Sequence, residues 1–344
     1  MNIKPQKIKC IVWDLDNTLW DGVLLEDEEV KLRSNVLNII IELDKRGIIH
    51  SIASKNDYAT AMQKLKEFDI EQYFLYPQIN WNAKSESIKT ISQALNMGLN
   101  TFAFIDDLLF ELNEVQSELP EVLLINAEHV SDLLTKEEFI PNFITEDSKL
   151  RRQMYLNDVK RNQVEREYCG PKEGFLASLC MKFAIKEAEL EDLQRVEELT
   201  LRTHQLNTTG YTYSYNELCS LIHSDKHKIL VSSLEDKFGT YGKIGIALIQ
   251  CEEKVWTIKL LLMSCRVMSR GVGSILINYI INLARQAKVE LQAEFIHNNV
   301  NRMMYVTYKF SGFEEIEQKN GVSLLAYDFN QQNGYPKYIE LKIN

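Results

Sequence analysis

Residues 12–20 read VWDLDNTLW, and this stretch decides the fold of the first half of the chain. The apolar run that leads into it predicts a buried strand ending at Asp14. Ligands of open α/β sheets bind where parallel strands end, so Asp14 and Asp16 are candidate site residues. Their side chains point to opposite sides of an extended chain, and Asn17 and Thr18 favour the turn that brings them together. An acidic turn that binds nothing is the alternative.

The composition places the chain among ordinary globular proteins. Its 344 residues suggest about two domains, and 45% hydrophobic with 26% charged residues is usual for such a protein. A net charge of −10 argues against general nucleic-acid binding, which needs a basic surface. It leaves room for a small anionic substrate, because a local site can be positive within an acidic protein.

The cysteines and the apolar segments of the chain indicate in which cellular compartment we expect the protein. The six cysteines form no CxxC pair, which argues against a zinc site, and their scatter through apolar segments suits free thiols in a reducing cytoplasm. The first ten residues lack the apolar stretch of a signal peptide, and no segment approaches the length of a membrane span. We therefore expect a cytoplasmic protein without a membrane partner.

Two further strands are predicted in the first half, and both end in polar residues. The apolar run at 48–53 ends at Ser54, whose hydroxyl could bind a phosphoryl oxygen or cap the next helix. The run at 101–105 ends at Asp106 and Asp107. Magnesium prefers hard oxygen ligands, and neighbouring strand ends would supply them from Asp14 and Asp106.

Lys84 opens a helix that the sequence predicts to continue to residue 97. A lysine is unfavourable at this end of the helix dipole, which attracts anions. The position makes sense if Lys84 and the helix start hold an anion together, and a solvated surface lysine is the alternative.

The order and spacing of Asp14/Asp16, Ser54, Lys84 and Asp106/Asp107 resemble the four motifs of the haloacid dehalogenase (HAD) phosphatases. The resemblance implies Asp14 as nucleophile, Asp16 as general acid and base, and a magnesium site of Asp14, Asp16, Asp106 and Asp107. It also implies phosphate binding by Thr18, Ser54, Lys55, Asn56 and Lys84. The gaps after Trp20 and between Ser54 and Lys84 are too short for a cap domain.

The second half has a different pattern. A charged stretch over residues 145–166 predicts a helix with a solvated face, on which Arg161 is a surface residue. Contact of Arg151, Arg152 and Arg161 with an anionic partner is the alternative. Farther on, an apolar strand ending near Cys265 is followed by Gly271, Gly273 and an amphipathic helix, a place where backbone can approach a phosphate. With the later pattern N-x6-Y-x3-GF, this resembles the GNAT acyltransferases, although Met268 stands where that family has Gln or Arg.

A capless HAD domain followed by a GNAT-like domain resembles the FkbH-like glyceryl-transferase/phosphatase family. Beyond the HAD motifs, the likeness rests on DLDNTLWDG, SKND, WNAKSESI, KLRRQMY, RTHQLNTTG, DKFGTYGKIG and SCRVMSRGVG. It implies an α/β fold with a phosphatase domain at 1–140, a helical linker at 141–180 and a GNAT-like domain at 181–344. It also implies that 1,3-bisphosphoglycerate loses phosphate and its glyceryl unit becomes a thioester on the phosphopantetheine of an acyl carrier protein, for polyketide or related biosynthesis.

Cys265 is the candidate thiol for acyl transfer. In a GNAT fold its strand runs beside the pantetheine arm, and Arg266 and the following helix start both favour the thiolate. Cys10 precedes Asp14, but four residues of strand place it roughly 13 Å back in the core. His204, Gln205 and Asn207 are candidate acyl-site residues, with local helix capping as the alternative for them.

The sequence departs from the family pattern at two places. Leu108 and Leu109 follow Asp107 where the family commonly has Asn-Pro, and His204 stands where it usually has Asn. Two other functions remain open: a phosphatase of a sugar or carrier-bound phosphate fused to a CoA-dependent N-acyltransferase, and a non-catalytic protein that docks a carrier.

Overall fold

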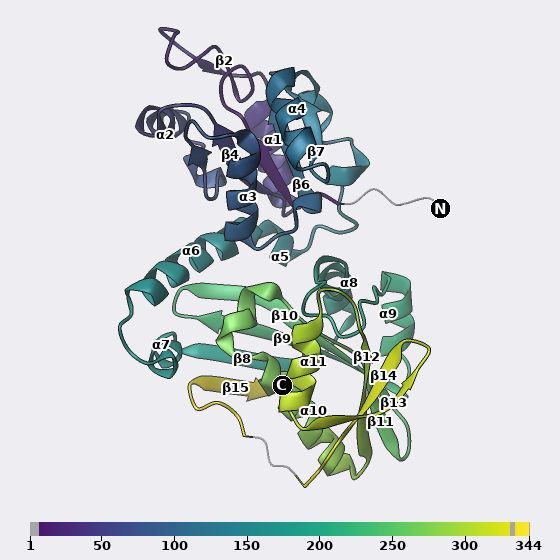
Figure 1. Cartoon of the computed structure of the whole chain (residues 1–344). Coiled ribbons are helices and arrows are strands. Elements are labelled where there is room, and N and C mark those ends of the chain that lie inside the picture. The colour runs from purple at the N-terminus through teal and green to yellow at the C-terminus, as the bar shows by residue number, and fades with distance from the viewer. Residues whose placement is uncertain (1–6, 331–333, 344) are drawn as a thin grey trace. The chain divides into compact units, whose positions relative to one another are not determined.

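The computed structural model describes residues 7–330 and 334–343. The chain divides into two compact units, Met1–Leu156 and Asn157–Asn344, and each has its own central sheet (Figure 1). Within the described residues, no helix combines the length and the apolar character needed to cross a bilayer.

The first unit is built on a parallel sheet in the order β5-β4-β1-β6-β7. Its strands are β1 (Cys10–Trp13), β4 (Ile49–Ser54), β5 (Gln78–Ile79), β6 (Phe102–Asp106) and β7 (Leu123–Asn126). The helices are α1 (Val36–Lys45), α2 (Tyr58–Glu67), α3 (Lys84–Leu95), α4 (Leu109–Glu118) and α5 (Glu146–Lys149), and a short hairpin joins β2 (Trp20–Asp21) to β3 (Lys31–Leu32).

Alternating side chains of β1 explain why helices cover both faces of this sheet. Ile11 and Trp13 pack in one apolar cluster with residues of α1 and α2, whereas Cys10 and Val12 pack in another with residues of α3 and α4. A strand buried on both faces reads as a continuous apolar run, which is what the sequence contains. The prediction of a doubly wound parallel sheet is confirmed.

The starts of α1 and α2 show which residues cap these helices. The N-cap of α1 is Asn35, in the left-handed conformation with φ 65°. The N-cap of α2 is Asp57, whose carboxylate accepts a hydrogen bond from the Thr60 N–H, so Ser54 does not cap this helix. Ser54 is instead the buried last residue of β4.

The second unit contains a mixed sheet in the order β13-β14-β12-β11-β10-β9-β8-β15. The strands are β8 (Met181–Glu187), β9 (His227–Asp236), β10 (Gly239–Cys251), β11 (Val255–Met263), β12 (Glu290–Ile296), β13 (Phe313–Lys319), β14 (Val322–Tyr327) and β15 (Ile339–Ile343). The helices are α7 (Lys172–Ser178), α8 (Leu193–Arg202), α9 (Tyr215–Ile222), α10 (Gly273–Ala287) and α11 (Arg302–Phe310). Residues of α7, α10 and α11 form the core on one face, and those of α8 and α9 form the core on the other.

Strands β11 and β12 pair only from Val255 to Ile258, and beyond that point another segment bonds to both. The Thr208 N–H donates to the Leu261 carbonyl at 3.0 Å, and its own carbonyl accepts from the Ile296 N–H at 3.0 Å. The Met263 N–H donates to the Leu206 carbonyl at 2.9 Å. The chain itself therefore satisfies the backbone groups that the diverging strands would leave unpaired.

Helix α6 (Arg151–Glu167) contains a fully buried arginine where the sequence predicts a surface residue. Arg161 donates two hydrogen bonds to Asp236, at 2.7 and 2.8 Å, and a third to Asp158 at 2.8 Å. Its guanidinium also lies 3.8 Å from the centre of the Tyr241 ring. The prediction of a solvated face is wrong at Arg161, because the partners come from β9 and β10, far away in sequence.

Removal of the Asp236 carboxylate should destabilise the second unit strongly. Asp236→Ala would leave a buried guanidinium without its bidentate partner, which typically costs about 3–5 kcal/mol. Hydrogen exchange of the β9 and β10 amides reports on this unit and should accelerate accordingly. Asp225→Ala, at an exposed position of the same unit, is the control. Equal exchange in the two variants would contradict a structural role for the ion pair.

Candidate active site

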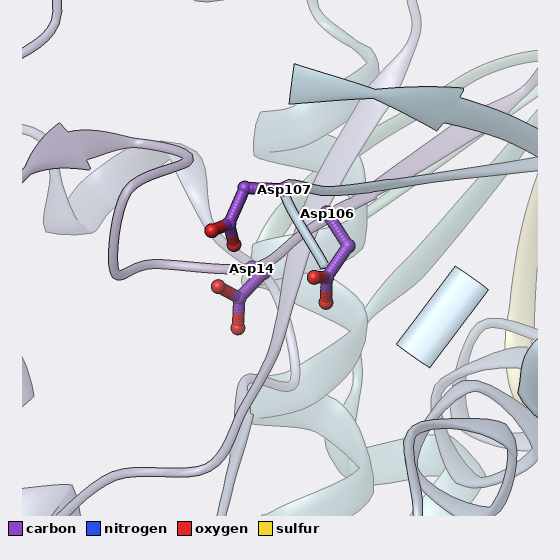
Figure 2. A group of neighbouring side chains, drawn as sticks. All are labelled: Asp14, Asp106 and Asp107. Atoms are coloured by element: carbon purple, nitrogen blue, oxygen red, sulfur yellow. The ribbon is translucent and has the colours of Figure 1, made fainter. Parts of the chain in front are cut away.

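Three carboxylates meet at the carboxyl edge of the first sheet. Asp14 follows β1 and Asp106 ends β6, and these strands are adjacent and parallel. Asp107 is the next residue, and Figure 2 shows its carboxylate directed toward the same space as the other two. One ligand oxygen from each residue lies within 4.8 Å of the others, and Asp14 and Asp106 are buried.

Lys84 brings a cation into this group from the first position of α3. Its Nζ donates to a carboxylate oxygen of Asp14, to Asp106 Oδ2 at 3.1 Å and to the Ala53 carbonyl at 2.9 Å. Only 3% of the residue is exposed, so the solvated surface lysine is excluded. Burial lowers the pKa of Lys84, but the charges of Asp14 and Asp106 outweigh burial and raise its pKa overall.

The carboxyl groups of the cluster have raised pKa values. Burial raises the pKa of Asp14, and Lys84 opposes this effect in part. Burial and the charge of Asp14 raise the pKa of Asp106 to about 6, and the same two causes raise the pKa of Asp107. Crowded carboxylates favour bound protons, or a cation that replaces them.

The donor set fits a magnesium ion. Asp14, Asp106 and Asp107 offer hard carboxylate oxygens close enough for one ion, which is the ligand type that Mg²⁺ prefers. The Leu108 N–H donates to Asp106 Oδ1 at 2.8 Å, so a backbone bond orients Asp106 although Leu108 and Leu109 follow Asp107 in place of the Asn-Pro of the resemblance. The side chains of Leu108 and Leu109 are exposed.

The structure does not bring the Asp16 carboxylate into this cluster. Its Oδ1 accepts from the Trp20 indole at 2.8 Å and from the Leu24 N–H at 3.0 Å, and its Oδ2 accepts from Asn56 at 2.9 Å. Three of the four expected metal ligands therefore lie together among the described residues, and Asp16 is held beside them. Asn56, which the resemblance predicts to bind phosphate, donates to Asp16.

The other expected phosphate-binding residues also have partners at the strand ends. A hydrogen bond from Ser54 to Asp14 opposes the rise in the pKa of Asp14. The Thr18 hydroxyl donates to Asp107 Oδ1 at 3.5 Å. Lys55, which is about one-third exposed, donates to Glu111 at 2.7 Å.

The sequence analysis missed two residues of α4 that contact this region. Glu111 binds Lys55, and Glu114 binds both the N–H and the hydroxyl of Ser85, next to Lys84. The one available signal was Ala83 before the helix start, because alanine cannot cap a helix and leaves the capping bond to another side chain.

The candidate thiol of the second unit is partly exposed. Cys265 lies two residues beyond β11 and opens a short 3-10 helix, and its Sγ is 3.9 Å from Gln205 Oε1. Arg266 donates to the Tyr241 carbonyl at 2.9 Å. His204 and Gln205 are exposed, and Cys265 beside Gln205 is partly exposed.

Other expected acyl-site residues have roles within the fold. The Asn207 side chain accepts from the N–H groups of Thr209 and Gly210, at 3.1 and 2.8 Å, and so stabilises a turn rather than a helix end. Gly271 has φ +72°, and a side chain there would meet the Tyr338 hydroxyl. Gly273 is the first residue of α10, where an added Cβ would meet no atom within 4 Å in the described part of the chain.

The thiol that precedes Asp14 lies in the core. Cys10 is fully buried in β1, and burial raises its pKa well above the usual value. A thiol held neutral in this way is a poor nucleophile, which leaves Cys265 as the better candidate.

Comparisons with known proteins give partial structural likeness. No protein-family profile matches the chain, and no curated protein matches it. Among solved structures, the N-terminal part of a Bacteroides fragilis protein, containing a phosphatase domain complexed with Mg, is 27% identical with a TM-score of 0.32. That match covers 45% of this chain and 40% of the other, so this chain spans less than half of that protein's solved length.

Two N-acetyltransferases are also similar to part of the chain. The ribosomal-protein-S18-alanine N-acetyltransferase of Escherichia coli is 17% identical with a TM-score of 0.34, and the match covers 44% of this chain and 99% of that one. The spermidine N-acetyltransferase of Vibrio cholerae is 17% identical with a TM-score of 0.33, over 42% and 92% of the two chains.

Magnesium should stabilise the protein in a pH-dependent way. At a hundredfold excess over its dissociation constant, a ligand adds about 2.7 kcal/mol to the free energy of unfolding. Because the pKa of Asp106 is raised to about 6, protons compete with the ion below that pH and affinity should fall. Thermal unfolding with and without Mg²⁺ at pH 7.5 and pH 5 tests this.

Asp106→Asn should abolish this thermal shift, whereas Asp69→Asn, at an exposed turn, should preserve it. A shift of equal size in Asp106→Asn would exclude this site as the magnesium site.

Proposed function

We propose that this chain is a glyceryl transferase and phosphatase of the FkbH-like kind, acting on 1,3-bisphosphoglycerate and an acyl carrier protein. The observation that carries the phosphatase half is the cluster of Asp14, Asp106 and Asp107 with Lys84 at one sheet edge. The segments RTHQLNTTG, DKFGTYGKIG and SCRVMSRGVG of the second unit, which resemble the family, support the transferase half.

The first unit has groups for each part of phosphoryl transfer. An Asp14 oxygen attacks phosphorus, the bond from phosphorus to the substrate oxygen breaks, and the leaving oxygen takes a proton from Asp16. Water then attacks phosphorus and gives a proton to Asp16, the bond from phosphorus to the Asp14 oxygen breaks, and inorganic phosphate leaves with Asp14 restored. The bond from Asn56 to Asp16 Oδ2 must open for this exchange. Lys84 holds its charge beside the phosphoryl oxygens, and bound Mg²⁺ would offset the remaining negative charge.

The second unit carries the acyl chemistry in this proposal. The Cys265 thiolate attacks the acyl-phosphate carbon of 1,3-bisphosphoglycerate, a sulfur–carbon bond forms and phosphate leaves with its bridging oxygen. The thiolate of the carrier's phosphopantetheine then attacks this thioester and frees Cys265. The partly exposed position of Cys265 beside Gln205 supports access of both substrates.

The alternative of a CoA-dependent N-acyltransferase differs from this proposal in the acyl donor and in the acceptor. In the GNAT resemblance the strand before Cys265 runs beside a pantetheine arm, and residues 206–208 bond to the edge of β11 at Leu261 and Met263. Because CoA and the carrier share the pantetheine arm, this contact does not separate the two functions, and the donor and acceptor must be tested. Release of free CoA from acetyl-CoA in the presence of an amine would favour the alternative.

Loss of the Asp14 nucleophile should remove phosphatase activity. Asp14→Asn is expected to lower Mg²⁺-dependent phosphate release from 3-phosphoglycerate by at least about 10³-fold, because an amide is a poor nucleophile. Inorganic phosphate is measured directly, and Asp69→Asn serves as the control with an equal change of charge. Retained activity in Asp14→Asn would place the chemistry elsewhere.

A covalent glyceryl adduct should form on Cys265. Wild-type protein incubated with 1,3-bisphosphoglycerate should gain the mass of a phosphoglyceryl or glyceryl group in intact-protein mass spectra, and Cys265→Ala should not. Cys180→Ala removes an exposed cysteine and should keep the adduct. An unchanged adduct in Cys265→Ala would overturn this assignment.

A further inference from the structure

Helix α4 starts directly after the aspartates of the cluster and carries two acidic residues one turn apart that contact other parts of the site. Glu111 accepts a hydrogen bond from Lys55 at 2.7 Å. Glu114 accepts from the Ser85 N–H at 3.1 Å and from the Ser85 hydroxyl at 2.5 Å. Glu114 thus joins α4 to the first turn of α3.

This contact replaces the missing cap of α3. The N-cap residue is Ala83, which has no side chain able to accept a bond from the first-turn N–H groups. A carboxylate at a helix start is favourable for the helix dipole, whereas the ammonium of Lys84 at the same place is unfavourable. One N–H of this helix start, that of Ser85, is therefore bonded to the chain's own Glu114.

We propose that Glu114 is the positioning residue for Lys84. By fixing the first turn of α3, it holds Lys84 where its Nζ reaches Asp106 at 3.1 Å, the Ala53 carbonyl at 2.9 Å and the Asp14 carboxylate. Because α4 follows Asp106 and Asp107 in the chain, the same contact fixes Lys84 relative to the metal-binding loop. The catalytic consequence rests on the proposed phosphatase function, but the positioning itself does not.

The first experiment measures exposure of Lys84 without any substrate. The native protein is pulsed briefly with an amine-reactive acylating reagent, and modification of Lys84 is quantified by peptide mass spectrometry. Loss of a helix cap typically changes the opening equilibrium by about fivefold or more, so Glu114→Ala should raise Lys84 labelling by about that factor. Hydrogen exchange of the amides at residues 85–88 should accelerate in parallel.

The chain offers a matched control on the same two helices. Glu118 of α4 pairs with Lys89 of α3 at 3.6 Å, and both side chains are exposed. Glu118→Ala removes a contact between α3 and α4 away from Lys84 and should leave labelling and phosphate release at wild-type levels. Glu114→Gln keeps a hydrogen-bond acceptor and should give intermediate labelling.

The second experiment measures the kinetics of phosphate release. Glu114→Ala should lower kcat by about tenfold or more while KM changes less, because Lys84 is displaced from the reacting groups, and Glu114→Gln should recover part of kcat. A role limited to stability would leave kcat unchanged at temperatures where the variant is folded. If wild-type protein releases no phosphate, the proposed function fails, and the labelling still decides whether Glu114 positions Lys84.

Two results would overturn the proposal. One is labelling of Lys84 in Glu114→Ala no higher than in the wild type, and the other is labelling in Glu118→Ala as high as in Glu114→Ala. If Glu114→Ala does not fold, Ser85→Ala removes only the hydroxyl bond and should raise labelling by about twofold. Unchanged labelling in folded Ser85→Ala would then count against the contact.

Discussion

The ion pairs between Lys84 and the two buried carboxylates Asp14 and Asp106 hold the edge of the first sheet together. A buried ammonium without partners is costly, and so are two carboxylates that share one dry site. The attraction between the ammonium and the carboxylates offsets the cost of burying each of them. For this reason Lys84 can be almost fully buried at the unfavourable end of a helix. The arrangement still leaves Asp106 with a raised pKa, so the edge is suited to a further cation.

The loops around this edge hold one another in place through side chains. Asn56, after β4, bonds to Asp16, after β1, and the Thr18 hydroxyl bonds to Asp107, after β6. These contacts join neighbouring strand ends at the point where the sheet no longer provides backbone bonds. The geometry of the site therefore depends on polar contacts between these loops as well as on the sheet.

In the second unit, two neighbouring strands diverge inside the sheet. Where β11 and β12 diverge, backbone groups would be left without partners, and the segment around Thr208 bonds to both strands. Asn301 strengthens this arrangement, because its side-chain amide donates to the carbonyls of Asn207 and Ile296. The partly exposed Cys265 therefore follows a strand, β11, whose backbone groups are already bonded to residues 206–208, and Gln205 lies beside it.

The local pattern alone determined much of the first unit. Apolar runs buried on both faces specify strands whatever the rest of the chain does, so β1, β4 and β6 were predicted to within a residue or two, with Asp14, Ser54 and Asp106 at their ends. Only the tertiary structure decided the burial of Arg161, the partners of Asp16 and the cap that Glu114 gives to α3. These depend on which elements approach each other across long sequence separations, and periodicity holds no information on that approach.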